Sequence, residues 1–387
     1  MENSKVLGFI FRGFPLGWVC LFVLGGIFVA GLWPFSPFPK NGVEWLQSEN
    51  GIRFHGRGFV HGLESRLGAL PRRSDGKSFT VELWLRPEIE PQNYLPVFLS
   101  IYDQHSLEAI QFAQWRSEFI VRRQNLDTPL EYQEFGLGSQ LRAGERRVVT
   151  IVFDVSQTLY YVDGKLKGRH PSNPFWSFDH QATRWILGNS PNGRSAWQGD
   201  VFALALYNRA LTGDEVSRKF GEGSKLEFPV VSAEKCCTAL FVFAEKSGEL
   251  ISSRVDPEDH FHIAKFFHPP HKEILTPPWK DFEIKQSYLM DMSVNVLGFM
   301  PFGFFFAIWF KKYLAVSSRE SIRLTVVVAA ALSLSIELMQ AWIPLRDSQL
   351  MDLLTNTSGA AAGAFCFAVS KKYSQMSARV SACRNTS

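Results

Sequence analysis

The chain has 387 residues and a formal net charge of +4, with 46% hydrophobic and 20% charged residues, averages that would suit an ordinary soluble protein. Their distribution excludes that class, because residues 14–33 carry no charge, and residues 292–310, 324–343 and 353–370 are interrupted by Glu337 alone. Five Cys are too few for a disulfide scaffold. Apolar runs near this length match the ~30 Å hydrocarbon core at ~1.5 Å per residue, so we expect four membrane-spanning helices.

Basic residues flank these apolar runs in alternation. The segments 1–13, 311–323 and 371–387 carry a net charge of +8, and because the whole chain carries +4, the remainder carries −4. Lys and Arg concentrate in the cytoplasmic loops of membrane proteins. We therefore expect a multi-pass protein of a bacterial cytoplasmic membrane with both termini in the cytoplasm. Residues 34–288 and the short loop 344–351 would then lie outside.

The first apolar run, residues 14–33, has two interpretations, a cleaved signal peptide or an uncleaved anchor. It is longer than the apolar core of a typical signal peptide, which has about 7–15 residues. No clear small-residue cleavage site follows it. We therefore interpret it as a transmembrane helix.

Residues 40–268 contain short runs of alternating apolar and polar residues, divided by Gly, Pro, Asn and Asp. Residues 79–85 and 148–153 are two such runs. A third, residues 159–162, leads into Asp163-Gly164, a pair that supplies the positive φ angles of a tight hairpin turn. Many short strands with little helix between them indicate an all-β sandwich or jelly roll.

Four segments of this region resemble the laminin G-like, concanavalin A-like jelly-roll family. They are residues 51–60 (GIRFHGRGFV), 79–87 (FTVELWLRP), 160–165 (YYVDGK) and 197–216, which ends in YNRALTGDEV. Their order matches that of the family, and the resemblance covers about residues 42–222. It implies a jelly-roll fold whose relatives bind sugars, proteins or calcium, so the fold alone does not give the ligand.

The opening strand usual in that family is missing before residue 51, and a similar segment follows the family's usual end, at residues 239–248 and 260–263. This order indicates a circular permutation. It predicts that the strand at 240–243 pairs within the same jelly roll as the strand at 79–85. Domain termini tend to lie close together at the surface, which makes permutation tolerable.

Calcium is the one cofactor that the sandwich residues suggest, and it needs about six to eight oxygen ligands. The candidates, each of which also has a plain explanation at a turn or strand end, are Asp154, Asp163, Asp200 and Asn208. The Glu-x-Asp-x-x-Glu string of glycan-cleaving jelly rolls does not occur. We expect no other metal, because the histidines lack acidic or Cys partners at ligand spacing.

Residues 269–288 begin with PPHKEILTPPWK, a proline-rich stretch that favours extended and semi-rigid backbone. We interpret this segment as the linker from the sandwich back to the membrane. Residues 289–370 then form the membrane domain, with helices at about 292–310, 324–343 and 353–370.

Polar residues recur at helical spacing within the membrane domain. Three pairs each share one helix face, and an arginine lies in the loop after the second pair: Asp291 with Asn295, Glu337 with Gln340, Asp352 with Asn356, and Arg346. The expected topology places all three faces at the outer end of their helices, so we predict one polar pocket open to the outside. A charge at the centre of a span costs about 2.5–3.5 kcal/mol, which makes such residues functional candidates. The alternative is that polar contacts merely hold the helices together.

The same residues resemble the VanZ-like membrane family. The resemblance rests on Asp291, 295–303 (NVLGFMPFG), 337–340 (ELMQ), Arg346, Asp352 and 356–359 (NTSG), and it extends to the first apolar run. It implies a link to resistance to the glycopeptide antibiotic teicoplanin. The family has no securely assigned reaction, so the resemblance names a family more firmly than a chemistry.

Three functions remain open on these grounds. The first is a binding protein, whose jelly roll binds a cell-envelope glycan or protein and whose pocket holds a membrane lipid. The second is an outer-leaflet enzyme acting on a lipid-linked glycan or peptidoglycan precursor, with Glu337 or Asp352 as acid or base and Arg346 clamping an anion. The third is a transporter or flippase component. We favour binding over catalysis, because the sequence shows no nucleophile with its base, no metal cage and no phosphate loop. We expect no nucleic-acid partner.

Overall fold

The computed structural model divides the chain into two compact units. One comprises residues 38–272, and the other comprises residues 1–37 with 273–387. The residues described are 16–62, 78–102, 110–124, 132–171, 184–226, 237–281 and 286–384. The expected cytoplasmic segment 1–13 lies outside them.

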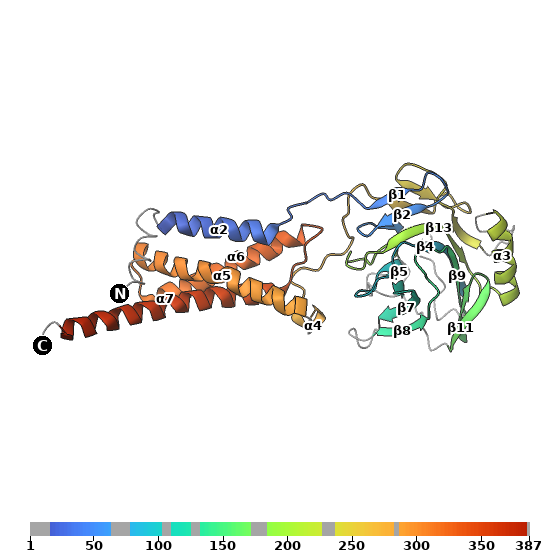
Figure 1. The fold of residues 1–387 in the computed structure, drawn as a ribbon. Coiled ribbons are helices and arrows are strands. Elements are labelled where there is room, and N and C mark those ends of the chain that lie inside the picture. Colours follow the sequence, from blue (N-terminus) through green and yellow to red (C-terminus); the bar gives the residue numbers. More distant parts are fainter. Residues whose placement is uncertain are drawn as a thin grey trace. The chain divides into compact units, whose positions relative to one another are not determined.

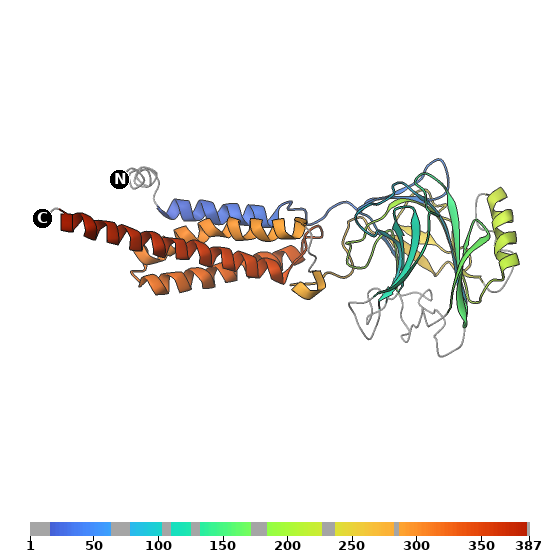
Figure 2. The ribbon, with the colours of Figure 1, turned by 60° about the horizontal axis from the view of Figure 1, so that its bottom comes forward.

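The unit of residues 38–272 is a sandwich of two antiparallel sheets, as expected from the alternating pattern (Figures 1 and 2). The first sheet has, in spatial order, β1 (Val43–Trp45), β2 (Ile52–His55), β13 (Gln198–Tyr207), β4 (Phe79–Pro87), β9 (Arg147–Phe153), β10 (Gln157–Val162) and β11 (Lys165–Pro171), with β14 (Cys237–Phe241) also paired to β13. The second has β15 (Leu250–Ser252), β16 (His260–Ile263), β3 (Val60–Gly62), β12 (Arg184–Leu187), β5 (Val97–Tyr102), β6 (Ile110–Trp115), β7 (Glu118–Gln124) and β8 (Tyr132–Leu137).

The late strands belong to this sandwich, which confirms the predicted pairing. One end of β13 pairs with β2 and the other end pairs with β14, while β4 lies along the opposite edge of β13. In the second sheet, β16 pairs with β3. The rings of Phe241 on β14 and Phe261 on β16 meet edge to face at 4.7 Å, so the late segment also contacts itself across the core.

Aromatic side chains fill the space between the sheets. Phe79 and Phe153 are direct neighbours on β4 and β9, and their rings stack at 4.3 Å. Trp185 and Trp197 are both almost fully buried in the same core. Because burial of one large apolar side chain contributes about 1.5–3 kcal/mol, this core supplies the driving force for the sandwich.

Helix α3 (Gly213–Leu226) follows β13 and packs on the outer face of the first sheet. It begins with a capping box, in which Glu215 N–H donates to Thr212 Oγ1 and Thr212 N–H donates to Glu215 Oε2. Arg209 donates two hydrogen bonds to the same carboxylate. Arg209, with Thr212, lowers the pKa of Glu215 to about 2.

The second unit is helical (Figure 1). Its helices are α2 (Leu16–Leu32), α4 (Pro278–Asp281), α5 (Gln286–Tyr313), α6 (Ser318–Ala341) and α7 (Leu350–Arg384). Three of them, α5, α6 and α7, contain segments long and apolar enough to cross a membrane. The described part of the expected span 14–33 is the 17-residue apolar helix α2, which is shorter.

The helix ends differ from those expected from hydropathy. Residues 314–317 connect α5 to α6, where a loop over 311–323 was expected. The basic residues of that stretch therefore lie in the last turn of α5 and the first two turns of α6. Ser317 and Glu320 form a capping box that fixes the start of α6. Helix α7 continues beyond the expected end at residue 370 into the polar tail.

Glycines let α5 and α7 pack backbone against backbone. A Cβ on Gly359 would lie 2.2 Å from the carbonyl oxygen of Val296, and one on Gly363 would lie 2.0 Å from that of Met300. No side chain fits at such distances. The stripe of small residues on α7 is thus a helix-packing face.

Part of the expected linker 269–288 belongs to the helical unit and makes specific contacts within it. Thr276 N–H donates to the carbonyl oxygen of Ser348 at 2.9 Å, and Leu350 N–H donates to that of Thr276 at 3.0 Å. Leu275 N–H donates to Ser348 Oγ at 3.1 Å. This short parallel bridge holds the loop between α6 and α7.

Candidate functional site

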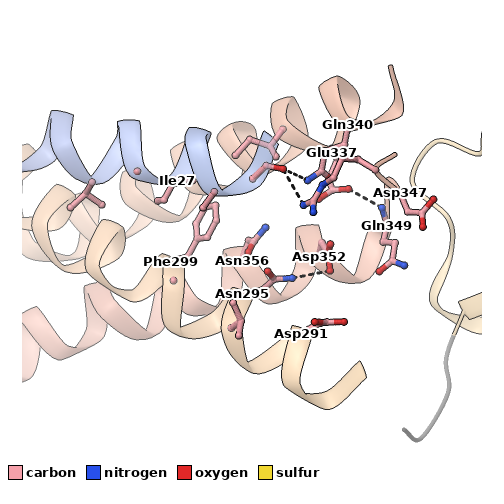
Figure 3. A pocket seen from close by; sticks show the side chains of 18 of the residues that line it. Ile27, Asp291, Asn295, Phe299, Glu337, Gln340, Asp347, Gln349, Asp352 and Asn356 are labelled. Atoms are coloured by element: carbon pink, nitrogen blue, oxygen red, sulfur yellow. Dashed lines mark hydrogen bonds between the residues drawn. The ribbon is translucent and has the colours of Figure 1, made fainter. Parts of the chain in front are cut away.

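A pocket of about 720 Å³ lies among the helices of the second unit (Figure 3). The seven polar residues singled out in the sequence all line it: Asp291, Asn295, Glu337, Gln340, Arg346, Asp352 and Asn356. They come from α5, α6, α7 and the loop between α6 and α7. Pairs spaced by three or four residues along each helix thus meet at one place.

Glu337 is the most deeply placed carboxylate of the pocket, with 1% of its surface exposed. Its Oε2 accepts a hydrogen bond from the backbone N–H of Gln349 at 2.8 Å. Gln349 belongs to the loop that Thr276 holds, so the linker indirectly fixes this donor. The carboxylate is therefore held in one orientation before any ligand arrives.

Side-chain amides link the helices around the pocket. Asn295 Nδ2 on α5 donates to Asp352 Oδ1 on α7 at 2.8 Å. Asn356 Nδ2 on α7 donates to Ser333 Oγ on α6 at 3.0 Å. These contacts also fit the structural alternative, in which polar groups hold helices together.

Gly31, in the last turn of α2, supplies a partner that the sequence does not reveal. Its carbonyl oxygen accepts from Gln340 Nε2 at 2.6 Å and from Arg346 Nη2 at 3.1 Å. The last carbonyls of a helix lack intrahelical partners and favour nearby cations, which is the one general signal that could have suggested this contact. The expected pairing of Arg346 with Glu337 or Asp352 stays a prediction.

Apart from Asp347 and Gln349, the rest of the pocket wall is apolar. It includes Phe22, Val23 and Ile27 on α2 and Val294 and Phe299 on α5. The site is therefore amphipathic, with carboxylates and amides on one side and hydrocarbon on the other. Such a pocket can take a molecule with a polar head and an apolar tail.

Residues 237–371 match the family model described as VanZ/LLP1, and residues 66–217 match the model described as the concanavalin A-like lectin/glucanases superfamily. The chain therefore combines a VanZ-like region with a concanavalin A-like domain. The VanZ-like match begins at β14, inside the sandwich, and does not include α2. No curated protein matches the chain.

Solved structures that match part of the chain share little sequence with it. A putative carbohydrate binding protein from Bacteroides ovatus is 10% identical with a TM-score of 0.40, over 57% of this chain and 61% of that one. The binding domain of Paraclostridial Mosquitocidal Protein 1 is 15% identical with a TM-score of 0.36, over 48% and 46%. The binding domain of Botulinum neurotoxin DC is 12% identical with a TM-score of 0.37, over 47% and 45%.

The four calcium candidates of the concanavalin A-like domain do not form one group. Asp154 and Asp163 lie at opposite ends of the β9–β10 hairpin. Asp200, within β13, accepts hydrogen bonds from Arg53 and Arg86, and Asn208 follows the end of that strand. Within the described ranges, no three His, Cys, Asp or Glu side chains are grouped so as to hold a metal ion.

The carboxylates among these candidates have partners of other kinds. Asp163 pairs with Arg147 at 2.7 Å and accepts from Val148 N–H at 3.0 Å. Asp154 accepts from Ser78 Oγ at 2.9 Å and from Val155 N–H at 2.8 Å. These contacts explain both residues as parts of turns.

Proposed function

We propose that this protein is a membrane-anchored binding protein of the cell envelope. Its concanavalin A-like domain binds an envelope glycan or protein, and the pocket of its VanZ-like region binds the polar head of a membrane lipid. The observation that carries the proposal is the amphipathic pocket of about 720 Å³, which places buried polar groups beside an apolar wall within membrane helices. Its size lies within the range of small-ligand sites.

The glycan part of the proposal rests on the family match of residues 66–217. Many members of this fold class bind sugars, and other members bind other ligands. The match therefore supports a type of ligand and not one compound. Basic residues lie near the end of α5, near the start of α6 and in the C-terminal part of α7, and such residues favour the cytoplasmic side of a membrane. The concanavalin A-like domain would then lie outside, where it could meet an envelope glycan.

We further propose a location in a bacterial cytoplasmic membrane, with both termini inside and the sandwich outside. The charge distribution supports it, because the tail after residue 370 and the region around the α5–α6 connection are basic. Membrane-impermeant thiol labelling of single cysteines in a cysteine-free background tests it. Asn192→Cys should react in intact cells and Leu314→Cys only after lysis. The reverse pattern would overturn the topology.

A binding screen of the purified full chain tests the function itself. We expect retention of one class of envelope glycan on an array and co-purification of lipid that Glu337→Gln reduces. Glu320→Gln is the matched control, because it makes the same change on the same helix away from the pocket and keeps the capping box, which also accepts Gln. Failure of both readouts for the native protein would contradict the proposal.

An outer-leaflet enzyme is the second candidate, and the fixed orientation of Glu337 favours it. A carboxylate held by the N–H of Gln349 is positioned as a general base should be. Arg346→Ala distinguishes an enzyme from a purely structural role of the pocket. An enzyme should lose turnover of a lipid-linked glycan precursor while the variant is still exported, whereas a structural role predicts lower stability instead. Teicoplanin sensitivity of cells with and without the chain is a cellular readout for either candidate.

A further inference from the structure

The hydrogen-bond donors and acceptors of the pocket are unevenly used. The amide nitrogens of Asn295, Gln340 and Asn356 each donate to another group of the protein. The amide oxygens of Gln340 and Asn356, in contrast, accept no hydrogen bond within the described part of the chain. Gln340 and Asn356 therefore offer acceptors to a ligand, while their amide donors already have partners.

For Gln340, the hydrogen-bond partner itself shows which atom of the side-chain amide is the nitrogen and which is the oxygen. Its amide nitrogen faces the carbonyl oxygen of Gly31, a group that can only accept, so the amide cannot be reversed. Its Oε1 must then be the free acceptor, and the residue is 2% exposed. A buried acceptor without a donor is costly to the protein, and a ligand that supplies the donor removes that cost.

The charged residues of the pocket also favour one kind of ligand, a cation. Four carboxylic acids line it against a single guanidinium, Arg346: Asp291, Glu337, Asp347 and Asp352. A cation near this set is favoured, and an anion is disfavoured, because the surrounding helices screen charge less than water does. The apolar wall formed by α2 and α5 lies beside the acidic side and would accommodate a hydrocarbon chain.

We propose that the pocket selects lipids whose headgroup carries a protonated primary amine. The inference rests on the proposed function, since it specifies which headgroup the pocket takes. An ammonium group has one positive charge and three N–H donors, and it therefore meets both the acidic charge and the free amide oxygen. A trimethylammonium group has the charge without the donors, and a polyol has donors without the charge.

Three diacyl lipids with identical chains test the proposal on the full-length protein in a neutral maltoside detergent. The probes are phosphatidylethanolamine, phosphatidylcholine and phosphatidylglycerol, and native mass spectrometry measures each affinity. We expect phosphatidylethanolamine to bind at least tenfold more tightly than either of the others, which corresponds to about 1.4 kcal/mol. Glu337→Gln and Asp291→Asn should each reduce this preference severalfold, and Glu320→Gln should not.

The outcomes separate this inference from the proposed function. Equal binding of phosphatidylethanolamine and phosphatidylcholine would overturn the inference, because the N–H donors would then not be recognised. Tighter binding of phosphatidylglycerol would also overturn it but would leave the pocket a lipid-headgroup site. Binding of no lipid above detergent would overturn both. The Asp291 variant keeps the test valid if Glu337→Gln proves unstable.

Discussion

Gln340 on α6 donates its side-chain amide to the carbonyl oxygen of Gly31 on α2 at 2.6 Å, and Gly31 is one residue from the end of that helix. The contact satisfies a carbonyl that has no partner within its own helix. It also determines which atom of Gln340 is left for a ligand. One hydrogen bond therefore both attaches the short helix α2 and defines the acceptor of the pocket.

Gln340→Leu should loosen α2. The change removes a buried hydrogen bond and leaves the Gly31 carbonyl with one fewer donor, which costs about 1–2 kcal/mol. We expect a lower thermal unfolding temperature in detergent and a lower yield of disulfide cross-links between cysteines placed on α2 and α6. Leu338→Ala, at a 43% exposed position of the same helix, should leave the cross-link yield unchanged. Equal yields for the Gln340 variant and the native protein would contradict the assigned role.

Gly359→Ala should disrupt the contact between α5 and α7. The new Cβ would lie 2.2 Å from the carbonyl oxygen of Val296, so one backbone must move away from the other. Overpacking of this kind costs about 1–3 kcal/mol. Thermal unfolding of the purified chain measures it, with Gly25→Ala as the control, because a Cβ at Gly25 meets nothing within 4 Å. A native unfolding temperature for the Gly359 variant would show that the two helices are not packed so closely.

Much of the architecture follows from periodicity. Apolar and polar residues that alternate with a period of two predicted the strands. The spacing of Asp352 and Asn356 predicted that both would face the same side of a helix. The late strand could be assigned to the sandwich because its residues resemble a family strand that is missing earlier in the chain. Alternation does not show which strands pair with each other. One edge of β13, for example, pairs with β2 at one end and with β14 at the other.

The remaining features depend on groups that a sequence does not distinguish. Every residue has a carbonyl and nearly every one an N–H, so nothing marks the oxygen of Gly31 or the N–H of Gln349 as part of the pocket. Hydropathy locates the hydrocarbon core and not the helix ends, because helices continue into water where caps and propensity allow. For that reason α7 extends past residue 370 and the α5–α6 connection is shorter than expected.

Asp200 should make the sandwich sensitive to strong acid. Burial alone would raise the pKa of Asp200, but its hydrogen bonds and ion pairs with Arg53 and Arg86 outweigh burial and lower it. An unfolded Asp has a pKa of about 3.9, so the stabilisation is complete above that pH and is lost as pH falls through the lower folded value. Urea unfolding of the full chain, followed by tryptophan fluorescence, should show this loss.

Asp200→Asn provides the control for that acid sensitivity. It should cost about 1–2 kcal/mol at pH 7, less than a fully buried pair would, because both guanidinium groups are partly exposed. The variant should also lose less stability than the native chain between pH 5 and pH 3, a range spanning the usual Asp pKa of about 3.9. Parallel pH profiles for the two proteins would show that this carboxylate does not contribute.

The pairing of β16 with β3 should weaken in mild acid. His61 and His262 stand directly opposite each other on these strands, with His262 Nδ1 3.3 Å from His61 Nε2, and Glu249 lies 3.5 Å from the other nitrogen of His262. Burial, together with the charge that His262 can carry, lowers the pKa of His61. An unfolded His has a pKa of about 6.5 and binds its proton before the folded one does, so stability is complete above that pH and falls as pH decreases toward the folded value.

Amide hydrogen exchange, corrected for its intrinsic pH dependence, tests the effect on β16 within the full chain. Protection of the backbone N–H groups of His61 and His262, which pair with each other across β3 and β16, should decrease between pH 7.5 and pH 5.5, a window that brackets the usual His pKa of about 6.5. The neighbouring β12–β5 pair, which contains no histidine, should keep its protection over the same range. His262→Phe keeps an aromatic ring beside His61, where the ring centroids lie 5.1 Å apart, but removes the charge that His262 can carry. The variant should therefore show a smaller pH effect, whereas an undiminished effect would place the responsible group elsewhere.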